Sequence, residues 1–362
     1  MVALLASLVA AATLAGPAPQ PRVLVAGPTL AGGRVVWGEQ HDGLNVLRSW
    51  PDSSPLWESA SNWFSGPLAG SAALVAFSRS YDGCPGTPGV ACPVETQAIA
   101  GPVRGSLRPL GPAERCSAGG ASRRLAVAGT LVAYFALGCT SSAGTVTVHD
   151  GARIVFRREG AACCDVALAG SRLALRSGGS VDVFDVRTHR LVYRTASPPL
   201  EPIAAFDLQA DGKLALVLGP PGTDGRARLA WRAPGSASLQ RLGLRIVLPA
   251  QGPAVRLVGD RIVTVAAGPH SSSDLVVADL QGHMRTLARF AAPVEQGGAI
   301  DAAGDRVAWA SRRIASTRVD CPPPGQGRPC RLLKSGTETV WVAGLRSGAP
   351  RPVARWSFVD SP

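Results

Sequence analysis

Short runs of alternating apolar and polar residues recur along the chain, and most of them begin beside a turn that contains glycine. The clearest copy is Leu257–Val265, LVGDRIVTV, in which two apolar runs meet at Gly259-Asp260. A period of two is typical of a half-buried β-strand, and a glycine turn between two such runs predicts a hairpin. Further copies occupy residues 30–38, 68–77, 127–135, 168–175, 209–218 and 302–310.

The copies are regularly spaced. Their turn glycines are Gly32, Gly70, Gly129, Gly170, Gly212, Gly259 and Gly304. Subtracting neighbouring residue numbers gives separations of 38, 59, 41, 42, 47 and 45, and the longest one contains an insertion. An all-β repeat of about 40–45 residues is typical of a β-propeller, in which each repeat forms one blade.

A second pair of strands follows each glycine turn, most clearly at residues 179–195, 273–290 and 338–356. Each repeat therefore supplies four strands. We predict an all-β fold, a seven-bladed β-propeller of four-stranded antiparallel blades, as a single domain over residues 21–362. The last repeat holds all four of its own strands, and residues 22–26 offer an alternative closing strand.

One column of positions, in the strand after each turn, is mostly large and apolar. Its members are Trp37, Phe77, Tyr134, Leu175, Leu216, Thr264 and Trp309. Large apolar side chains that recur once per repeat favour packing between neighbouring blades over a platform for stacking a ligand.

Two of the repeats carry a family resemblance. ADGKLALVL followed by RLAWRAPG, and AGDRVAWAS followed by TVWVAGLRSGAPRPV, resemble the repeats of exported TolB-like, WD-type bacterial β-propellers. This resemblance implies the fold and no activity. TolB itself has six blades and an extra amino-terminal domain, whereas this chain shows seven repeats, so its role is not transferred.

The start of the chain predicts export. Residues 1–20 form an apolar run followed by small residues and proline, as in a secretory signal peptide, although no Lys or Arg precedes the run. Retention of this segment as an anchor is the alternative. An even number of cysteines, eight, also favours an oxidising compartment. We expect a secreted or cell-envelope protein.

The cysteines share one face of the predicted ring. The loops from the second to the third strand of a blade, and from one blade to the next, form this "top face". It carries Cys84, Cys92, Cys116, Cys139, Cys163, Cys164, Cys321 and Cys330. Short loops predict the disulfides Cys84–Cys92 and Cys321–Cys330. For the other four we favour two bridges that use one each of Cys163 and Cys164, with Cys163–Cys164 plus Cys116–Cys139 as the alternative.

Ring closure would place blades seven, one and two side by side. The long, disulfide-bridged loops of blades seven and two would then flank the short loop of blade one. This arrangement predicts a notch on the top face. We expect its ligand-binding residues to be Glu39, His41 and Asp42, Arg79, Tyr81 and Asp82, and Arg312 and Arg313.

The opposite, "bottom" face is basic, and the formal net charge is +12. Its basic residues are Arg34, Arg172, Lys213, Arg261 and Arg306 beside the glycine turns, and Arg153, Arg187, Arg190 and Arg285 beside the outer turns. They suggest docking to an anionic polymer. No run of basic residues interleaves with aromatic ones, so we expect no nucleic-acid partner. The remaining expectations are a monomer, no metal and no cofactor.

No motif for hydrolysis, phosphate binding or dinucleotide binding is present. Asp165, Asp207 and Asp301 fall in the innermost strands, near the channel, but their offsets from the turn glycine differ. We therefore predict no catalytic residue. The predicted function is an exported noncatalytic binding scaffold for a protein or glycan at the top face. The alternative is a propeller enzyme, such as a lyase, a lactonase or a quinoprotein dehydrogenase, acting in the central channel.

Overall fold

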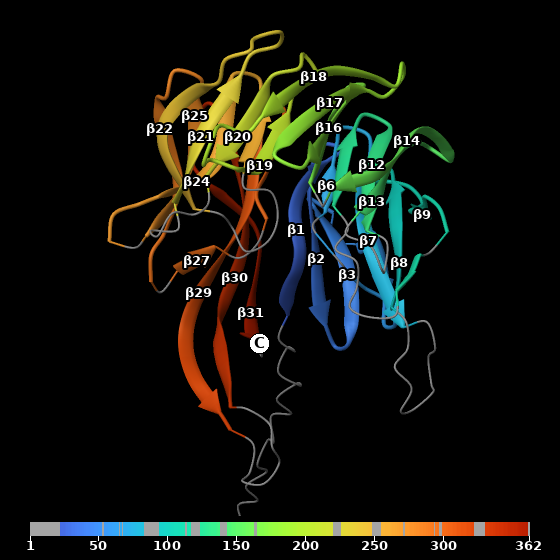
Figure 1. Cartoon of the computed structure of the whole chain (residues 1–362). Coiled ribbons are helices and arrows are strands. Elements are labelled where there is room, and N and C mark those ends of the chain that lie inside the picture. The colour runs from blue at the N-terminus through green and yellow to red at the C-terminus, as the bar shows by residue number, and fades with distance from the viewer. Residues whose placement is uncertain are drawn as a thin grey trace, which may run out of the picture.

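A computed structural model gives the fold (Figure 1). It describes residues 22–52, 54–64, 66, 68–82, 94–112, 114–116, 124–137, 143–162, 165–219, 226–247, 255–270, 272–292, 294–296, 299–321 and 330–360. The regular structure of these residues is β-strand, as predicted. Within these ranges, no helix is long and apolar enough to cross a membrane. The proposed signal peptide, residues 1–20, lies outside the described residues.

The first four sheets follow one another along the chain and are antiparallel. The first contains β1 (Val23–Ala31), β2 (Arg34–His41), β3 (Leu44–Trp50) and β4 (Trp57–Ser59). The second contains β5 (Trp63–Phe64), β6 (Ala69–Gly70), β7 (Val75–Asp82), β8 (Val94–Gly101), β9 (Arg108–Pro109) and β10 (Glu114–Cys116). The third contains β11 (Leu125–Ala128), β12 (Leu131–Leu137), β13 (Ala143–Asp150) and β14 (Arg153–Ala162). The fourth contains β15 (Val166–Ala169), β16 (Arg172–Ser177), β17 (Ser180–Asp185) and β18 (Arg190–Ala196).

The fifth sheet has eight strands in two halves, joined where Ile246 pairs with Ala266. One half is β19 (Ile203–Leu208), β20 (Leu214–Leu218), β21 (Arg226–Arg232) and β22 (Gln240–Val247). The other is β23 (Val255–Val258), β24 (Arg261–Ala267), β25 (Ser273–Asp279) and β26 (Met284–Phe290). The last sheet contains β27 (Val294–Gln296), β28 (Asp301–Ala303), β29 (Arg306–Asp320), β30 (Arg331–Gly344) and β31 (Arg351–Asp360).

Glycine turns join the first two strands in six of the seven repeats, as predicted, and Gly70 in the second repeat is the exception. Six of the seven glycines have a positive φ that favours glycine, namely Gly32, Gly129, Gly170, Gly212, Gly259 and Gly304. Gly70 serves a different purpose. It lies in β6, where a Cβ atom would come within 2.3 Å of the Leu30 carbonyl oxygen, so its lack of a side chain allows β6 to approach β1.

The core lies between the sheets. Separate apolar clusters fill the junction between each sheet or half-sheet and the next, and between the last sheet and the first. Their members include Leu47 with Phe77, Ala100 with Tyr134, Phe135 with Leu173, Val183 with Leu216, Leu229 with Ile262, Val277 with Trp309, and Val340 with Trp37. The column predicted to pack between blades, from Trp37 to Trp309, is buried throughout, which confirms that prediction.

The innermost strands surround a central cavity of about 580 Å³. Residues of β6, β11, β15, β19, β23 and β28 line it, so these strands from successive sheets face one another across one axis. Sheets that pack face to face around such a channel, with the last packed on the first, form a β-propeller. Each terminal sheet holds its own four-strand path, and β1, which includes most of residues 22–26, pairs with β2.

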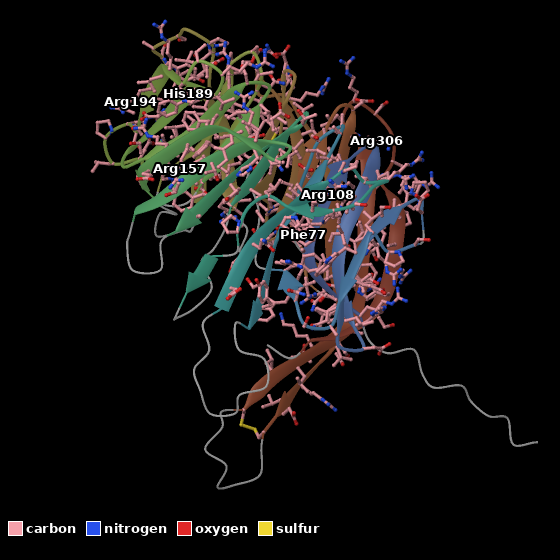
Figure 2. All side chains as sticks on the ribbon, turned by 90° about the vertical axis from the view of Figure 1, so that its right-hand side faces the viewer. Phe77, Arg108, Arg157, His189, Arg194 and Arg306 are labelled. Carbon is pink, nitrogen blue, oxygen red and sulfur yellow. A yellow bond between two sulfur atoms is a disulfide. The ribbon has the colours of Figure 1, made fainter. Side chains whose placement is uncertain are left out.

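Strands β29 and β30 are the longest, with 15 and 14 residues, and their far ends extend beyond the neighbouring strands as an arm (Figure 1). The predicted Cys321–Cys330 disulfide joins the tip of this arm (Figure 2). Cys84, Cys92, Cys139, Cys163 and Cys164 lie outside the described residues, as does the side chain of Cys116 in β10. Their pairings stay predictions.

Candidate functional site

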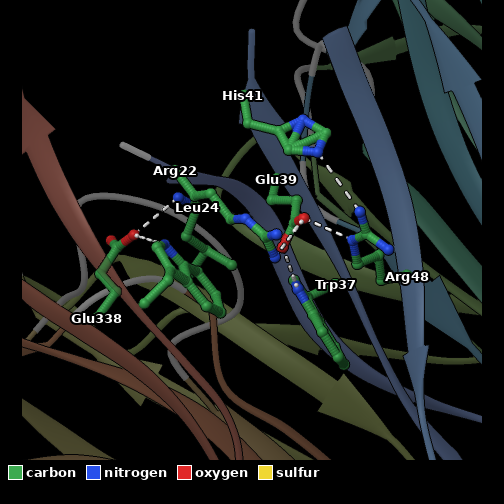
Figure 3. Close-up of polar contacts among 8 residues, drawn as sticks. Arg22, Leu24, Trp37, Glu39, His41, Arg48 and Glu338 are labelled. Atoms are coloured by element: carbon green, nitrogen blue, oxygen red, sulfur yellow. Dashed lines mark hydrogen bonds and ion pairs between the residues drawn. The ribbon is translucent and has the colours of Figure 1, made fainter. Parts of the chain in front are cut away.

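Glu39, predicted to bind a ligand, is fully buried in β2 beneath the top face. Its carboxylate accepts hydrogen bonds from Arg48 Nε at 2.5 Å, Trp37 Nε1 at 3.1 Å and Arg22 Nη1 at 3.4 Å (Figure 3). Two guanidinium groups and one indole therefore compensate the charge of this buried acid. Glu39 holds neighbouring strands in place, and its carboxylate faces the protein.

A second buried carboxylate, Glu338 in β30, lies on the other side of the junction between the first and last sheets. It accepts hydrogen bonds from the Leu24 amide at 2.8 Å, Trp356 Nε1 at 3.1 Å and Arg312 Nη2 at 2.7 Å. Burial raises the pKa of Glu338, and the nearby Arg312 guanidinium opposes this shift. Arg312, also predicted to bind a ligand, thus forms a buried ion pair and lies over the Phe358 ring.

The two carboxylates belong to one assembly. Leu24 pairs with Glu39 in the first sheet and donates its amide to Glu338 of the last sheet. The indoles of Trp37 and Trp356, which bond to one carboxylate each, stack with their centroids 6.5 Å apart. We call this assembly the seam. The structure brings Glu39 and Arg312 close to one junction, through residues that sequence reasoning missed.

His41 lies at the end of β2 and is half-buried. Its Nε2 lies 3.4 Å from Arg48 Nη2, and Figure 3 shows the ring on the same side as Glu39. Arginine only donates hydrogen bonds, so Nε2 is the acceptor in this contact. Asp42 follows in the exposed turn with φ of 49°.

The remaining predicted residues lie on either side of the seam. In β7 the Arg79 guanidinium donates to Gln97 Oε1 at 2.7 Å and lies 5.6 Å from the centre of the Tyr81 ring. Asp82 ends β7, and its side chain lies outside the described part. Arg313 is exposed in β29, where it pairs with Val294.

The channel contains a second set of charges. Arg256 in β23 lies between two aspartates, with Nη2 2.8 Å from Asp301 Oδ1 and Nη1 3.8 Å from Asp207 Oδ1. Asp301 Oδ2 also accepts hydrogen bonds from Thr29 Oγ1 at 2.5 Å and from the Leu30 amide at 2.8 Å. Asp207 Oδ2 accepts the Leu257 amide at 2.7 Å. Each aspartate thereby bonds to the backbone of the next repeat.

These three charged residues occupy one position of the repeat. Asp207 pairs with Ala215, Arg256 with Val263 and Asp301 with Ala308, each at the third pair from the hairpin. The offsets from the turn glycine differ because the hairpin between β19 and β20 is longer. The same position holds Thr29, Ala69, Ala126 and Ala167 in the other repeats. The channel wall is therefore charged on one side and apolar on the other.

Burial and neighbouring charges shift the pKa values of Asp207 and Arg256. Burial raises the pKa of Asp207, and the attraction of Arg256 opposes the shift. Burial disfavours the charge of Arg256, but Asp301 and Asp207 outweigh that effect and raise its pKa. Arg256 is therefore a permanent cation. Asp165 is likewise paired, with Arg176 at 2.8 Å. No cluster of three His, Cys, Asp or Glu side chains in the described ranges is arranged to hold a metal ion.

Several basic residues of the bottom face form bonds within the protein. Arg34 is buried and forms an ion pair with Asp52. Lys213 Nζ lies 2.6 Å from Asp260 and 3.2 Å from Asp211. Arg306 donates to the Gly33 carbonyl at 2.9 Å. These contacts reduce the basic charge that this face presents to an anionic polymer.

Sequence reasoning missed Arg48, Arg256 and Glu338. A signal existed for Arg256, which stands three residues before Gly259, as Asp301 stands three before Gly304. Opposite charges at one repeat position indicate a contact between adjacent innermost strands. Arg48 and Glu338 had no such signal, because their partners lie in other strands or in the opposite end of the chain.

The sequence matches no family model, and it has no significant match among curated proteins. Several solved structures have similar folds. BamB from Moraxella catarrhalis has 10% identity and a TM-score of 0.47, with 95% of this chain and 97% of that chain covered. The β-propeller domain of the Trilobed protease from Pyrococcus furiosus has 9% identity and a TM-score of 0.47, with 81% and 96% covered.

A puromycin-hydrolysing peptidase from Mycobacterium tuberculosis has 16% identity and a TM-score of 0.45, and the match covers 88% of this chain and 50% of the peptidase. At these identities and scores the likeness concerns the fold alone. The arrangement of sheets around the channel is itself that of a β-propeller, and it confirms the fold-level resemblance to β-propellers predicted from the repeats.

Proposed function

We propose that the protein is an exported, noncatalytic seven-bladed β-propeller that binds a protein or glycan at its top face. The apolar clusters support seven blades, because the described residues form seven of them, one at each junction around the ring. The fifth sheet then counts as two blades, since one residue pair joins its halves.

The arm carries this proposal. Residues 314–320 of β29 pair with β30 alone among the described strands, so one strand edge faces solvent. The cross-strand pair Val319 and Leu332 is 65% and 45% exposed. An isolated two-stranded ribbon is marginally stable, and the disulfide at the tip holds this one in place. An exposed ribbon that is held by a disulfide and carries an apolar pair near its tip is suited to contact with a partner.

We propose that the notch lies at the base of this arm, where β29 carries Arg312 and Arg313. Arg312 and Glu39 hold the seam, and we assign them a positioning role. We propose that His41, Asp42 and Arg313, which lie beside the seam, contact the ligand, with Arg79, Tyr81 and Asp82 completing the notch from the second sheet. The arm offers exposed apolar side chains and the notch offers charged ones, so a protein or glycan surface with both apolar and charged groups would fit them.

The disulfide also supports the compartment. Structural disulfides persist in oxidising compartments, so Cys321–Cys330 favours an extracytoplasmic location. We infer a signal peptide over residues 1–20 and one domain over residues 21–362, in keeping with this location.

The channel favours binding over catalysis. Asp165, Asp207 and Asp301 each form an ion pair with arginine, and the latter two also accept backbone amides. A general acid or base must exchange protons with a substrate, whereas these carboxylates connect strands. Their bonds support a structural role.

Site-specific photocrosslinking in the producing cells tests the proposal. A photoreactive amino acid replaces Val319 on the arm, and in a matched control it replaces Leu191, which is 48% exposed on β18. We expect a discrete crosslinked product from position 319 that is absent from position 191. Because a glycan adduct would differ from a protein adduct in mass, mass spectrometry identifies the class. Equal labelling from both positions, or none from 319, would exclude the arm as the contact surface.

A further inference from the structure

The central cavity has two unlike sides. Ala69, Ala126, Val127, Leu168 and Ala169 form an apolar arc contributed by β6, β11 and β15. The opposite arc is charged and comes from β19, β23, β28 and their turns. A volume of about 580 Å³ is within the range of small-molecule sites. Such a cavity fits a ligand that has a charged group and a hydrocarbon body.

The charged arc is acidic. Asp207, Asp211, Asp260 and Asp301 line the cavity together with Lys213 and Arg256, so four negative and two positive charges leave a net charge of −2. The whole chain has a formal charge of +12. The acidity of the cavity is therefore a local property of these strands, opposite in sign to the rest of the protein. It selects for a cation.

Of the two buried aspartates in this arc, Asp207 has the less compensated charge, with Arg256 at 3.8 Å and the Leu257 amide at 2.7 Å as its partners. Arg256 is 2.8 Å from Asp301 but 3.8 Å from Asp207, a distance beyond a hydrogen bond. Asp301 also receives the Thr29 hydroxyl and the Leu30 amide. The Asp207 side chain keeps a small exposed fraction, 12%, beside the cavity. A bound cation next to Asp207 would add to the compensation that Arg256 and the Leu257 amide supply.

The mouth of the cavity already shows how an alkylammonium is held. Lys213 Nζ lies 2.6 Å from Asp260 Oδ1 and 3.2 Å from Asp211 Oδ2, between two turns that line the opening. The lysine stem is a hydrocarbon chain that ends in an ammonium group. The same combination on a free ligand would match the carboxylates of the charged arc and the alanines that face them.

We propose that the channel binds an organic cation with an apolar body, with its ammonium or guanidinium group at Asp207 and its hydrocarbon on the apolar arc. An organic cation fits better than a metal ion, because the described side chains form no cluster of three metal-ligating groups. This site is separate from the top face, so it does not depend on the function proposed above.

Titration with n-hexylammonium tests the site, with n-hexanol and hexanoate as neutral and anionic probes of the same length. Binding is followed by isothermal titration calorimetry on the full chain. We expect saturable binding of the amine and binding of the alcohol and the acid at least about tenfold weaker, since the charge supplies the selectivity. Equal affinity for hexanol, or no saturable binding of the amine, would overturn the proposal.

Three variants locate the site. Asp207→Asn removes the charge and keeps an oxygen that can accept the Leu257 amide, so we expect the fold to persist and amine affinity to fall about tenfold. Ala169→Phe places a large ring at a half-buried position of the apolar arc, so it should fill part of the cavity and weaken the binding of the amine. Asp274→Asn, on β25 and paired with Arg289, is the matched control. Amine binding that Asp207→Asn and Ala169→Phe leave unchanged, or that Asp274→Asn reduces equally, would contradict this location.

Discussion

The backbone amide of Leu30, in the first sheet, donates a hydrogen bond to the Asp301 carboxylate of the last sheet across 2.8 Å. Thr29 adds its hydroxyl to the same oxygen. The equivalent bond two junctions earlier links Leu257 to Asp207. The two ends of the chain are thus joined by side chains that bond to backbone, while each terminal sheet keeps its own four-strand path.

Replacement of Asp301 by alanine should therefore open the ring closure. The change leaves the Leu30 amide, the Thr29 hydroxyl and one side of the Arg256 guanidinium without their acceptor. Removing one partner of a buried charged pair costs about 3–5 kcal/mol. Urea unfolding measures the loss. Asp305→Ala, in the adjacent exposed turn, is the control and should change stability by less than about 0.5 kcal/mol. Similar losses in both variants would refute the closure role.

The seam should depend on Glu39 in the same way. Glu39→Ala removes the common acceptor of Arg48, Trp37 and Arg22, and we expect a loss of about 3–5 kcal/mol with a change in tryptophan fluorescence. Glu39→Gln should lose less, since one amide oxygen remains. Glu58→Ala, on the exposed β4, serves as the control. A Glu39→Ala variant as stable as this control would show that the seam adds nothing to folding.

Tyr193 should make stability fall at high pH. Burial raises its pKa to about 12 from an ordinary value of 10.0, and its hydroxyl donates to the Gly212 carbonyl at 2.7 Å. Below pH 10 both folded and unfolded chains keep the proton, so its contribution is complete. As pH rises from 10 to 12 the unfolded chain ionises first, and stability is lost.

The near-ultraviolet absorbance of ionised phenol, followed together with chemical unfolding, measures this effect. Tyr193→Phe should remove that part of the pH dependence and cost about 1 kcal/mol at neutral pH through the lost hydrogen bond. A variant with the same stability slope above pH 10 as the parent would assign the effect to another group.

Reduction of the Cys321–Cys330 disulfide should loosen the arm and leave the ring intact. In the chain-entropy model a bridge across so short a loop is worth roughly 2.5 kcal/mol. Because residues 316–320 and 331–333 form a two-stranded ribbon, hydrogen exchange there should accelerate, by up to roughly 50-fold. Exchange in β23 and β28 provides the internal reference. Equal acceleration in those strands would mean that the bridge stabilises the whole ring.

Alanine substitutions at Gly259 and Gly70 should destabilise the protein to different degrees, in the opposite order to that expected from φ alone. Gly259→Ala places a Cβ at φ of 62° with open space around it, at a cost of about 1–2 kcal/mol. Gly70→Ala has no such φ, but its Cβ would meet the Leu30 carbonyl oxygen at 2.3 Å, so we expect a larger loss, at least about 2 kcal/mol. Thermal unfolding of both variants checks the order, and the reverse order would contradict the close approach of β6 to β1.

Much of the fold was predictable because its bonds are local. Strands β23 and β24 meet through the Gly259-Asp260 turn and pair over the following residues, so alternation and a glycine turn are enough to predict the hairpin. The buried column from Trp37 to Trp309 followed from the same periodicity. The tip disulfide was predictable too, because its cysteines are nine residues apart.

The contacts of the candidate site residues were not predictable from the sequence. Glu39, His41 and Arg312 were chosen as notch residues from the order of the blades, and the structure places them beside one junction. It could not be predicted that Glu39 and Arg312 face inward, because their partners come from strands with an independent register. Leu24 and Glu338 are 314 residues apart, and only ring closure brings them into contact.

By itself, the sequence determined the repeat, the antiparallel strands and most of the glycine hairpins, since these depend on periodicity and short turns. The tertiary structure decided which charges meet. Strand pairing places Asp207, Arg256 and Asp301 at the same position of their repeats. The distance from the turn glycine hides this for Asp207, because the hairpin after β19 is longer. Contacts between sheets depend on how each sheet is positioned around the channel, and that position is set by the packing of the whole ring.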